Sequence, residues 1–174
     1  MNKLKVQAPA KLNLHLQVIK RREDRFHDLN TVFQLIDLYD ELVFEKKKES
    51  IELQERINPI KDNIVLLAAK TLKKITNSPF GAKIYLNKQI PLQKGLGGGS
   101  SDAAATLIAL NKLWDTKLKQ NELSRIGLQI GSDVPFFIHG NSAWAEGRGE
   151  LFTTINLKPE WYLLIFPEGN LVLD

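Results

Sequence analysis

Apolar and polar residues alternate along the first part of the chain, a pattern that predicts β-strands. Residues 4–19 predict a strand with a break at 8–10, after which the apolar positions are Leu12, Leu14, Leu16 and Val18. A period of two is typical of a strand with one buried face. We therefore expect these apolar side chains inside and Lys11 and Asn13 on the opposite face.

Six further stretches have strand-like patterns. They are 29–44 (broken at 37–41), 51–53, 83–87, the pair 142–146 and 151–155 around a hairpin turn at 147–150, and 161–166 as a buried strand. A period near 3.6 predicts three helices, which are one after an Asp62 N-cap that ends near 77–79, one over 101–114, and one over 120–130 capped near Asn121.

The stretch Pro91–Asp102 stands out because four of the eleven glycines fall within positions 95–99. It lies between a predicted strand and a predicted helix. Glycine lets the backbone approach a ligand closely, and the first N–H groups of a helix attract anions. This order predicts a phosphate site, to which Lys94 would add positive charge and Ser100 or Ser101 a hydroxyl. The alternative is a flexible turn before a capped helix.

Two common nucleotide motifs do not fit this stretch. A P-loop ends in Gly-Lys-Ser/Thr, whereas Gly99 is followed by Ser100. A dinucleotide fingerprint needs a third glycine or alanine where Ser100 stands, and an acidic residue after a second strand. Here the segment after the predicted helix is predicted to be another helix, so the second condition is not met either.

The composition of the chain limits the classes of protein and site that it can form. The chain has 174 residues, enough for one domain, a formal net charge of +4 and no cysteine. Disulfides and thiolate metal sites are excluded, and the mild charge does not argue for nucleic acid. No apolar run approaches the length of a membrane span, and no signal peptide precedes the first strand. We expect a soluble, cytoplasmic protein.

Four other residues are functional candidates that also have an ordinary structural interpretation. Lys11 would commonly be a solvated strand lysine. Phe26 and His27 lie in a charged loop and would stack on a base or sugar, or anchor the loop to the core. Asp133 sits in a turn and would commonly be a cap.

Four stretches together resemble the galactokinase, homoserine kinase, mevalonate kinase and phosphomevalonate kinase (GHMP) family. Its phosphate loop has the form Pro-x-x-x-Gly-Leu-Gly-Ser-Ser-Ala. The matching stretches are Pro91–Ala103, Ala8–Leu14, Phe26–His27 with Thr31–Gln34, and Gly131–Phe136. The resemblance implies an α+β fold like domain 2 of ribosomal protein S5, with a mixed sheet and helices packed on one face.

The resemblance also implies roles. Lys11 and Asp133 match the catalytic pair, and Asn13, Phe26 and His27 the residues that hold a cytidine diphosphate substrate. The residues that match the ATP site are Asn63, Lys88, Pro91, Leu92, Gln93, Lys94, Gly95, Leu96, Gly97, Gly98, Gly99, Ser100 and Ser101, with Mg²⁺ near Ser100 or Ser101.

The implied activity is ATP-dependent phosphorylation of a cytidine diphosphate-linked alcohol in the non-mevalonate route to isoprenoids. Residues 1–166 would form the N-terminal domain, and 167–174 the start of a linker to a second domain. Two alternatives remain open, a related kinase for another alcohol and a non-catalytic nucleotide- or RNA-binding module. The oligomeric state is not indicated.

Overall fold

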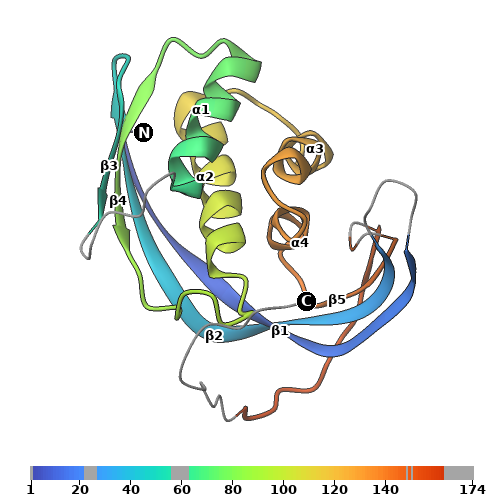
Figure 1. Cartoon of the computed structure of the whole chain (residues 1–174). Helices are drawn as coiled ribbons and strands as arrows, with labels where there is room; N and C mark the ends of the chain where they lie inside the picture. The colour runs from blue at the N-terminus through green and yellow to red at the C-terminus, as the bar shows by residue number, and fades with distance from the viewer. Residues whose placement is uncertain (1, 22–26, 56–62, 148, 150, 163–174) are drawn as a thin grey trace.

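A computed structural model describes residues 2–21, 27–55, 63–147, 149 and 151–162 (Figure 1). The elements in chain order are β1 (Lys3–Arg21), β2 (His27–Lys47), β3 (Ile51–Glu55), α1 (Ile64–Thr76), β4 (Gly81–Asn87), α2 (Gly98–Trp114), α3 (Gln120–Ile130), α4 (Val134–His139), β5 (Ala143–Glu146) and β6 (Leu151–Thr154).

The strands form one six-stranded sheet around β2. β1 pairs with β2 along almost its whole length, and β4 and then β5 pair with the other edge of β2. β3 runs parallel to β4, and every other pair is antiparallel. The four helices lie together on one side of the curved sheet (Figure 1). The predicted α+β fold, with a mixed sheet covered on one face, is confirmed.

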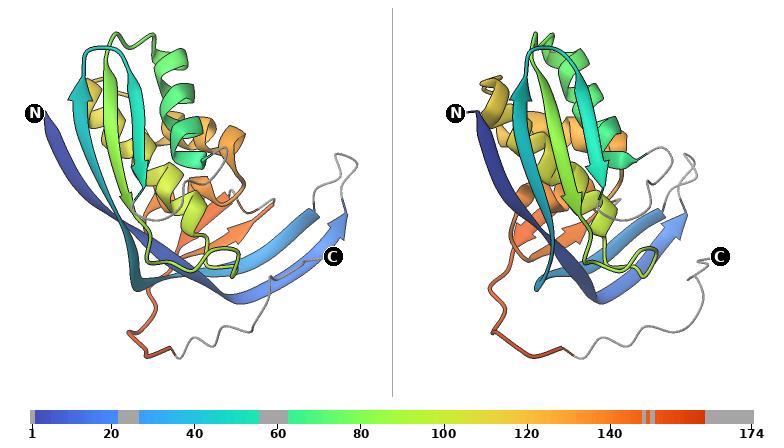
Figure 2. Two further views of the ribbon diagram at one scale, coloured as in Figure 1. Left: turned by 60° about the vertical axis from the view of Figure 1, so that its left-hand side comes forward. Right: turned by 90° about the vertical axis from the view of Figure 1, so that its left-hand side faces the viewer.

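The two long strands correct the sequence analysis. β1 and β2 are each continuous, and the predicted breaks at 8–10 and 37–41 are instead a register shift at Pro9/Ala10. They bend together and continue past the helices as a curved two-stranded ribbon (Figure 2). A strand with many inter-strand hydrogen bonds absorbs irregular residues, here Asp37 and Leu38, which pair with no residue of β1, as a bulge rather than ending there.

The buried face of β1 was predicted wrongly. Lys11 is only 7% exposed, whereas Leu14, Leu16 and Val18 are 44–58% exposed. A second register shift between Asn13 and His15 breaks the simple alternation. Lys11 lies between the two shifts, pairs with Leu35 and reaches Asp133 at the start of α4, so what looked like a solvated lysine belongs to the interior.

Helix α2 is the centre of the core. Ten of its residues are buried, including Ala103 and Ala104, whose small side chains permit the close packing expected of them. The indole N–H of Trp114 donates to the Gly81 carbonyl at 3.0 Å. The helix begins at Gly98, three residues before the predicted start, so the last glycines of the loop form its first turn.

Smaller corrections concern helix ends and the C-terminal part. Asn63 caps α1, and Lys119 rather than Asn121 stands at the N-cap of α3. The apolar segment after Asp133 is the short helix α4. The hairpin of β5 and β6 is confirmed. Trp161 is fully exposed outside any strand, which contradicts a buried strand there, and 163–166 lie outside the described residues. No helix in the described ranges is long and apolar enough to cross a bilayer.

Adjacent positions on α2 test this packing. Leu107 is fully buried and Ile108 is 42% exposed. Because truncating a buried leucine leaves a cavity, Leu107→Ala should lower the free energy of unfolding by about 2–5 kcal/mol, against ~1 kcal/mol or less for Ile108→Ala. Urea unfolding followed by circular dichroism measures both. Equal losses would contradict the placement of α2.

Candidate active site

The glycine-rich segment between β4 and α2 is a shaped loop rather than a flexible turn. Ile90 and Leu96 are 2% and 5% exposed and pack against Ala10 in a small apolar cluster beside the main core. Gln93, Gly95 and Gly97 have positive φ values of 55°, 75° and 71°. Since two of these positions carry glycine, which adopts positive φ without steric cost, the chain turns sharply and leads directly into α2.

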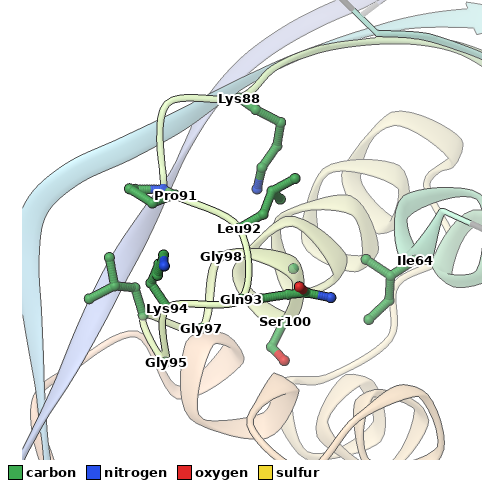
Figure 3. A pocket seen from close by; sticks show the side chains of 12 residues that line it. Ile64, Lys88, Pro91, Leu92, Gln93, Lys94, Gly95, Gly97, Gly98 and Ser100 are labelled. Atoms are coloured by element: carbon green, nitrogen blue, oxygen red, sulfur yellow. The ribbon is translucent and has the colours of Figure 1, made fainter. Parts of the chain in front are cut away.

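A cavity of about 270 Å³ opens over this loop (Figure 3). Its lining comprises Ile64 of α1, Lys88 and residues 91–100. The first i to i−4 bond of α2 runs from Ser101 N to Gly97 O (2.9 Å), so the preceding amides at the helix N-terminus have no intrahelical partner. These amides and the positive end of the helix dipole suit an anion.

Two residues expected at this site lie behind the cavity wall. The Asn63 side chain caps α1 by accepting from Val65 N at 2.8 Å, and it donates to Glu55 Oε1 at 2.6 Å. Ser101 is 1% exposed, and its hydroxyl has no hydrogen-bond partner in the described part of the chain. Ser100, by contrast, is partly exposed and lines the cavity.

Lys11 links the loop to Asp133. Its backbone N–H donates to the Leu96 carbonyl at 3.0 Å, which fixes the loop against β1. Its ammonium lies 3.5 Å from Asp133 Oδ2 and donates to Asn13 Oδ1. The lysine side chain is 8% exposed and that of Asp133 is 32% exposed. The pair therefore has a buried cation and an anion that solvent can reach.

Asp133 stands at the N-cap of α4, yet its side chain makes no capping hydrogen bond. This observation removes the ordinary interpretation of a turn aspartate as a cap. Phe136 of α4 stacks on Phe33 of β2 with ring centroids 4.5 Å apart, which holds the short helix on the sheet. The carboxylate is left to face Lys11.

Asn13 completes the arrangement. Its Nδ2 donates to Thr31 Oγ1 at 2.8 Å, and Thr31 in turn donates to the His15 carbonyl at 2.7 Å. This chain fixes the amide with its oxygen toward Lys11. The sequence analysis did not identify Thr31 in this role, because a strand threonine has no local signal for a partner across the strand. Phe26 and the His27 side chain lie outside the described residues.

Comparison with known proteins places this geometry in a family. Residues 63–141 match the family model described as GHMP kinases N terminal domain. Over these residues the chain is similar to a GHMP kinase N-terminal domain. A crystal structure of 4-(cytidine 5'-diphospho)-2C-methyl-D-erythritol kinase superposes with a TM-score of 0.79 at 39% identity, over 89% of this chain and 56% of that one. Methanococcus jannaschii mevalonate kinase, at 19% identity and a TM-score of 0.66, shares the fold.

Curated relatives are more similar in sequence. 4-Diphosphocytidyl-2-C-methyl-D-erythritol kinase of Shewanella baltica (strain OS223) is 50% identical over 94% of this chain and 59% of its own length. The same-named protein of Ruthia magnifica is 48% identical over 91% and 57%. The chain therefore spans somewhat more than half the length of these relatives.

The glycine loop, Lys11 and α4 approach one another closely at Gly97. A Cβ at this position would lie 2.8 Å from the Phe137 ring and 3.0 Å from Lys11 Cγ. The loop, the buried lysine and α4 thus meet where only a hydrogen fits. Sequence motifs mark this glycine as permissive for the backbone but do not reveal its neighbours.

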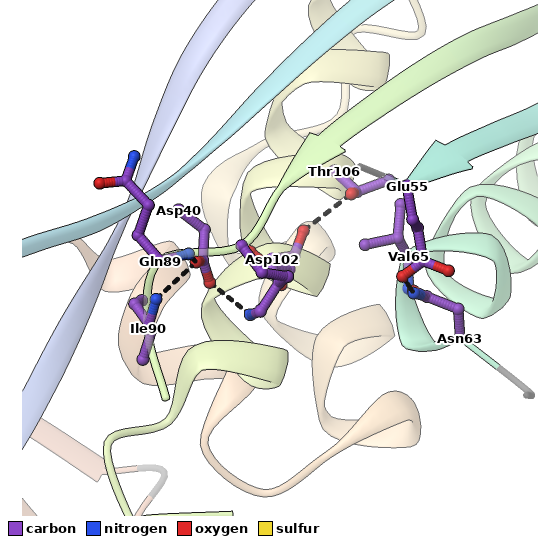
Figure 4. Close-up of polar contacts among 9 residues, drawn as sticks. Asp40, Glu55, Asn63, Val65, Gln89, Ile90, Asp102 and Thr106 are labelled. Carbon is purple, nitrogen blue, oxygen red and sulfur yellow. Dashed lines mark hydrogen bonds and ion pairs between the residues drawn. The ribbon is translucent and has the colours of Figure 1, made fainter. Parts of the chain in front are cut away.

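Lys88, which lines the cavity, lies between the carboxylates of Asp40 and Asp102, both of which Figure 4 labels. Its ammonium pairs with Asp102 Oδ2 at 2.7 Å and with Asp40 Oδ2. Burial raises the pKa of Asp102 to about 7, Lys88 partly opposes this rise, and Asp40 adds to it. Burial lowers the pKa of Lys88, but the two carboxylates outweigh it and the net shift is upward. The sequence analysis gave neither aspartate a role, because both pairs join distant elements.

Alanine substitutions at two glycines of the loop distinguish the cost of backbone strain from the cost of side-chain crowding. Gly95 has a positive φ similar to that of Gly97 but nothing within 4 Å of an added Cβ. Gly95→Ala should cost about 1–2 kcal/mol of unfolding free energy from strain alone, and Gly97→Ala about 1–3 kcal/mol more because Phe137 and Lys11 must move. Denaturant unfolding compares them, and equal costs would refute the close approach at Gly97.

The raised pKa of Asp102 predicts a pH dependence of stability. In the folded state this carboxyl holds its proton up to about pH 7, whereas in the unfolded state it loses it near pH ~4. Between these values the native state binds more protons, so this residue makes the free energy of unfolding fall as the pH rises. Unfolding of Asp102→Asn should show a smaller fall across this window than wild type. Asp115→Asn, at an exposed position, is the control and should follow wild type.

Proposed function

We propose that the chain supplies the ATP-binding and catalytic half of a kinase that phosphorylates the 2-hydroxyl of 4-diphosphocytidyl-2-C-methyl-D-erythritol. The observation that carries the proposal is the Lys11–Asp133 pair (3.5 Å), joined by the Lys11 backbone to a glycine loop at a helix N-terminus. Curated relatives of that name, up to 50% identical, support this choice of substrate.

Asp133 is assigned to the acceptor hydroxyl. Its carboxylate is partly exposed and makes no capping bond, so it can accept the hydroxyl hydrogen and orient the oxygen for attack. Lys11, held by Asp133 and Asn13, would steady the same hydroxyl and offset negative charge on the transferring phosphoryl group. Phosphoryl transfer depends mainly on such positioning and electrostatics.

The ATP site is assigned to the cavity over the loop. The residues from Gly95 to Ser100 present backbone amides at the positive end of α2, and Lys94 adds charge at the cavity wall. This donor set fits triphosphate oxygens. ATP supplies the phosphoryl group when bound. We place the adenine base of ATP beside Lys88, which lines the cavity. Asn63 would need to exchange its hydrogen bond to Glu55 in order to contact the adenine.

The serine hydroxyls of the loop are the candidate protein ligands for Mg²⁺. Ser100 offers a hydroxyl at the cavity, whereas the buried Ser101 hydroxyl does not line it. Among the described residues no group of three histidine, cysteine, aspartate or glutamate side chains could hold a metal. Mg²⁺ commonly binds through substrate phosphates with few protein ligands, so Ser100 fits the ion better than Ser101 does.

The acceptor would lie over the sheet beside Asn13, and we assign Phe26 and His27 to the same pocket, as the family resemblance implies. Residues 1–166 would form the N-terminal domain, and a further domain, which we infer from the length of the relatives, would close the site.

The direct test is transfer of labelled γ-phosphate from MgATP to 4-diphosphocytidyl-2-C-methyl-D-erythritol. Asp133→Asn should lower the rate by about 10²–10⁴-fold, the contribution of a positioned acid–base group. The assay is run with the chain alone and with the chain extended by the C-terminal part of a relative, because the second domain would be needed to hold the acceptor.

Asp115→Asn is the matched control, since it removes an exposed carboxylate (79%) whose side chain lies 3.8 Å from Lys117. It should leave transfer unchanged. If neither the chain alone nor the extended chain transferred phosphate, the kinase assignment would be contradicted. Equal, measurable transfer rates for wild type and Asp133→Asn would instead remove Asp133 from the mechanism.

A further inference from the structure

A buried charge cluster joins three elements at the back of the nucleotide cavity. Asp40 comes from β2, Lys88 follows β4, and Asp102 lies in the second turn of α2. The side chains of Asp40 and Asp102 are 0% and 3% exposed, and that of Lys88 is 12% exposed. The mechanism above uses neither aspartate.

The two carboxylates are held very differently. Asp40 accepts from three donors, namely Lys88 and the backbone amides of Gln89 and Ile90 at 2.6 and 2.8 Å. Asp102 accepts from Lys88 through Oδ2, while its Oδ1 is buried with no partner in the described part of the chain. Asp40 therefore serves the backbone of the loop as well as the lysine, whereas the side chain of Asp102 serves the lysine.

The ammonium of Lys88 has three N–H donors. Two point to Asp40 and Asp102, and the residue also lines the cavity. A Cβ on Gly98 would lie 3.2 Å from the Lys88 nitrogen, so the ammonium rests directly against the first turn of α2. Figure 3 shows it directed toward the cavity beside Leu92.

We propose that Asp102 and Asp40 are positioning residues that hold the Lys88 ammonium in the cavity wall, with its third N–H donor presented to the adenosine half of the bound nucleotide. The inference rests on the proposed function, because it requires that the cavity binds ATP. A lysine side chain has several rotatable bonds, and fixing it costs conformational entropy. Two carboxylates from different elements fix it before the nucleotide arrives, so binding does not bear that cost.

Calorimetric titration of the chain with MgATP tests the proposal. Asp102→Ala removes one of the two anchors and should raise the dissociation constant about three- to tenfold. Asp102→Asn keeps an acceptor oxygen for Lys88 and should restore most of the affinity. Neither variant should alter the binding of magnesium tripolyphosphate, which lacks the adenosine half.

Thr106→Ala is the matched control. Thr106 lies one turn further along α2, is fully buried, and donates its hydroxyl to the Asp102 backbone carbonyl rather than to Lys88. It should unfold more easily but bind MgATP as wild type does. An equal loss of affinity in Thr106→Ala and Asp102→Ala would overturn the proposal, because a general disturbance of α2 would then explain both.

Combining substitutions shows whether Asp102 acts through the lysine. Lys88→Met should weaken MgATP binding about tenfold or more, and adding Asp102→Ala to it should have no further effect. The double variant also relieves the buried negative charge that Lys88→Met leaves, which preserves a folded protein for the comparison. An undiminished effect of Asp102→Ala in the Lys88→Met background contradicts the proposal. Absence of MgATP binding by wild type would instead contradict the proposed function on which it rests.

Discussion

The hydrogen bond from the Lys11 amide to the Leu96 carbonyl sets the geometry of the whole site. It joins the middle of the glycine loop to β1, so the loop and the lysine side chain cannot move independently. Gly97 follows at once and must be glycine, because Phe137 and Lys11 occupy the space of a side chain. Through these contacts the sheet, the loop and α4 position one another.

The two lysines beside the loop are also held in place by contacts within the protein. Lys11 on one side is paired with Asp133, and Lys88 on the other with Asp40 and Asp102. Lys11 is buried and the Lys88 side chain is only 12% exposed, and a cation held away from water is stable only with such partners. Because these cations are already compensated, the attraction for phosphates comes chiefly from the amides and the dipole of α2. The fixed lysines contribute directed hydrogen bonds rather than free charge.

The sequence predicted what depends on neighbouring residues. The glycine loop before a helix, the hairpin of β5 and β6, and the turn at Asp133 each have local signals, and all are present. The sequence did not predict features that depend on contacts between residues far apart in the chain. Lys11 follows the register shift at Pro9/Ala10 and lies inward rather than on the exposed face as expected, and Asp40 meets Lys88 across 48 residues. The pattern of Leu12 to Val18 cannot reveal a bulge, because the partner strand sets it.

The central claim is that the loop cavity and the Lys11–Asp133 pair are one site. A crystal structure of the chain with Mg²⁺ and a non-hydrolysable ATP analogue tests it most directly. The account predicts the triphosphate on the amides of Gly97–Ser100, with the terminal phosphate directed to Lys11 and the base toward Lys88. A nucleotide bound elsewhere, or with its terminal phosphate directed away from Asp133, would contradict it.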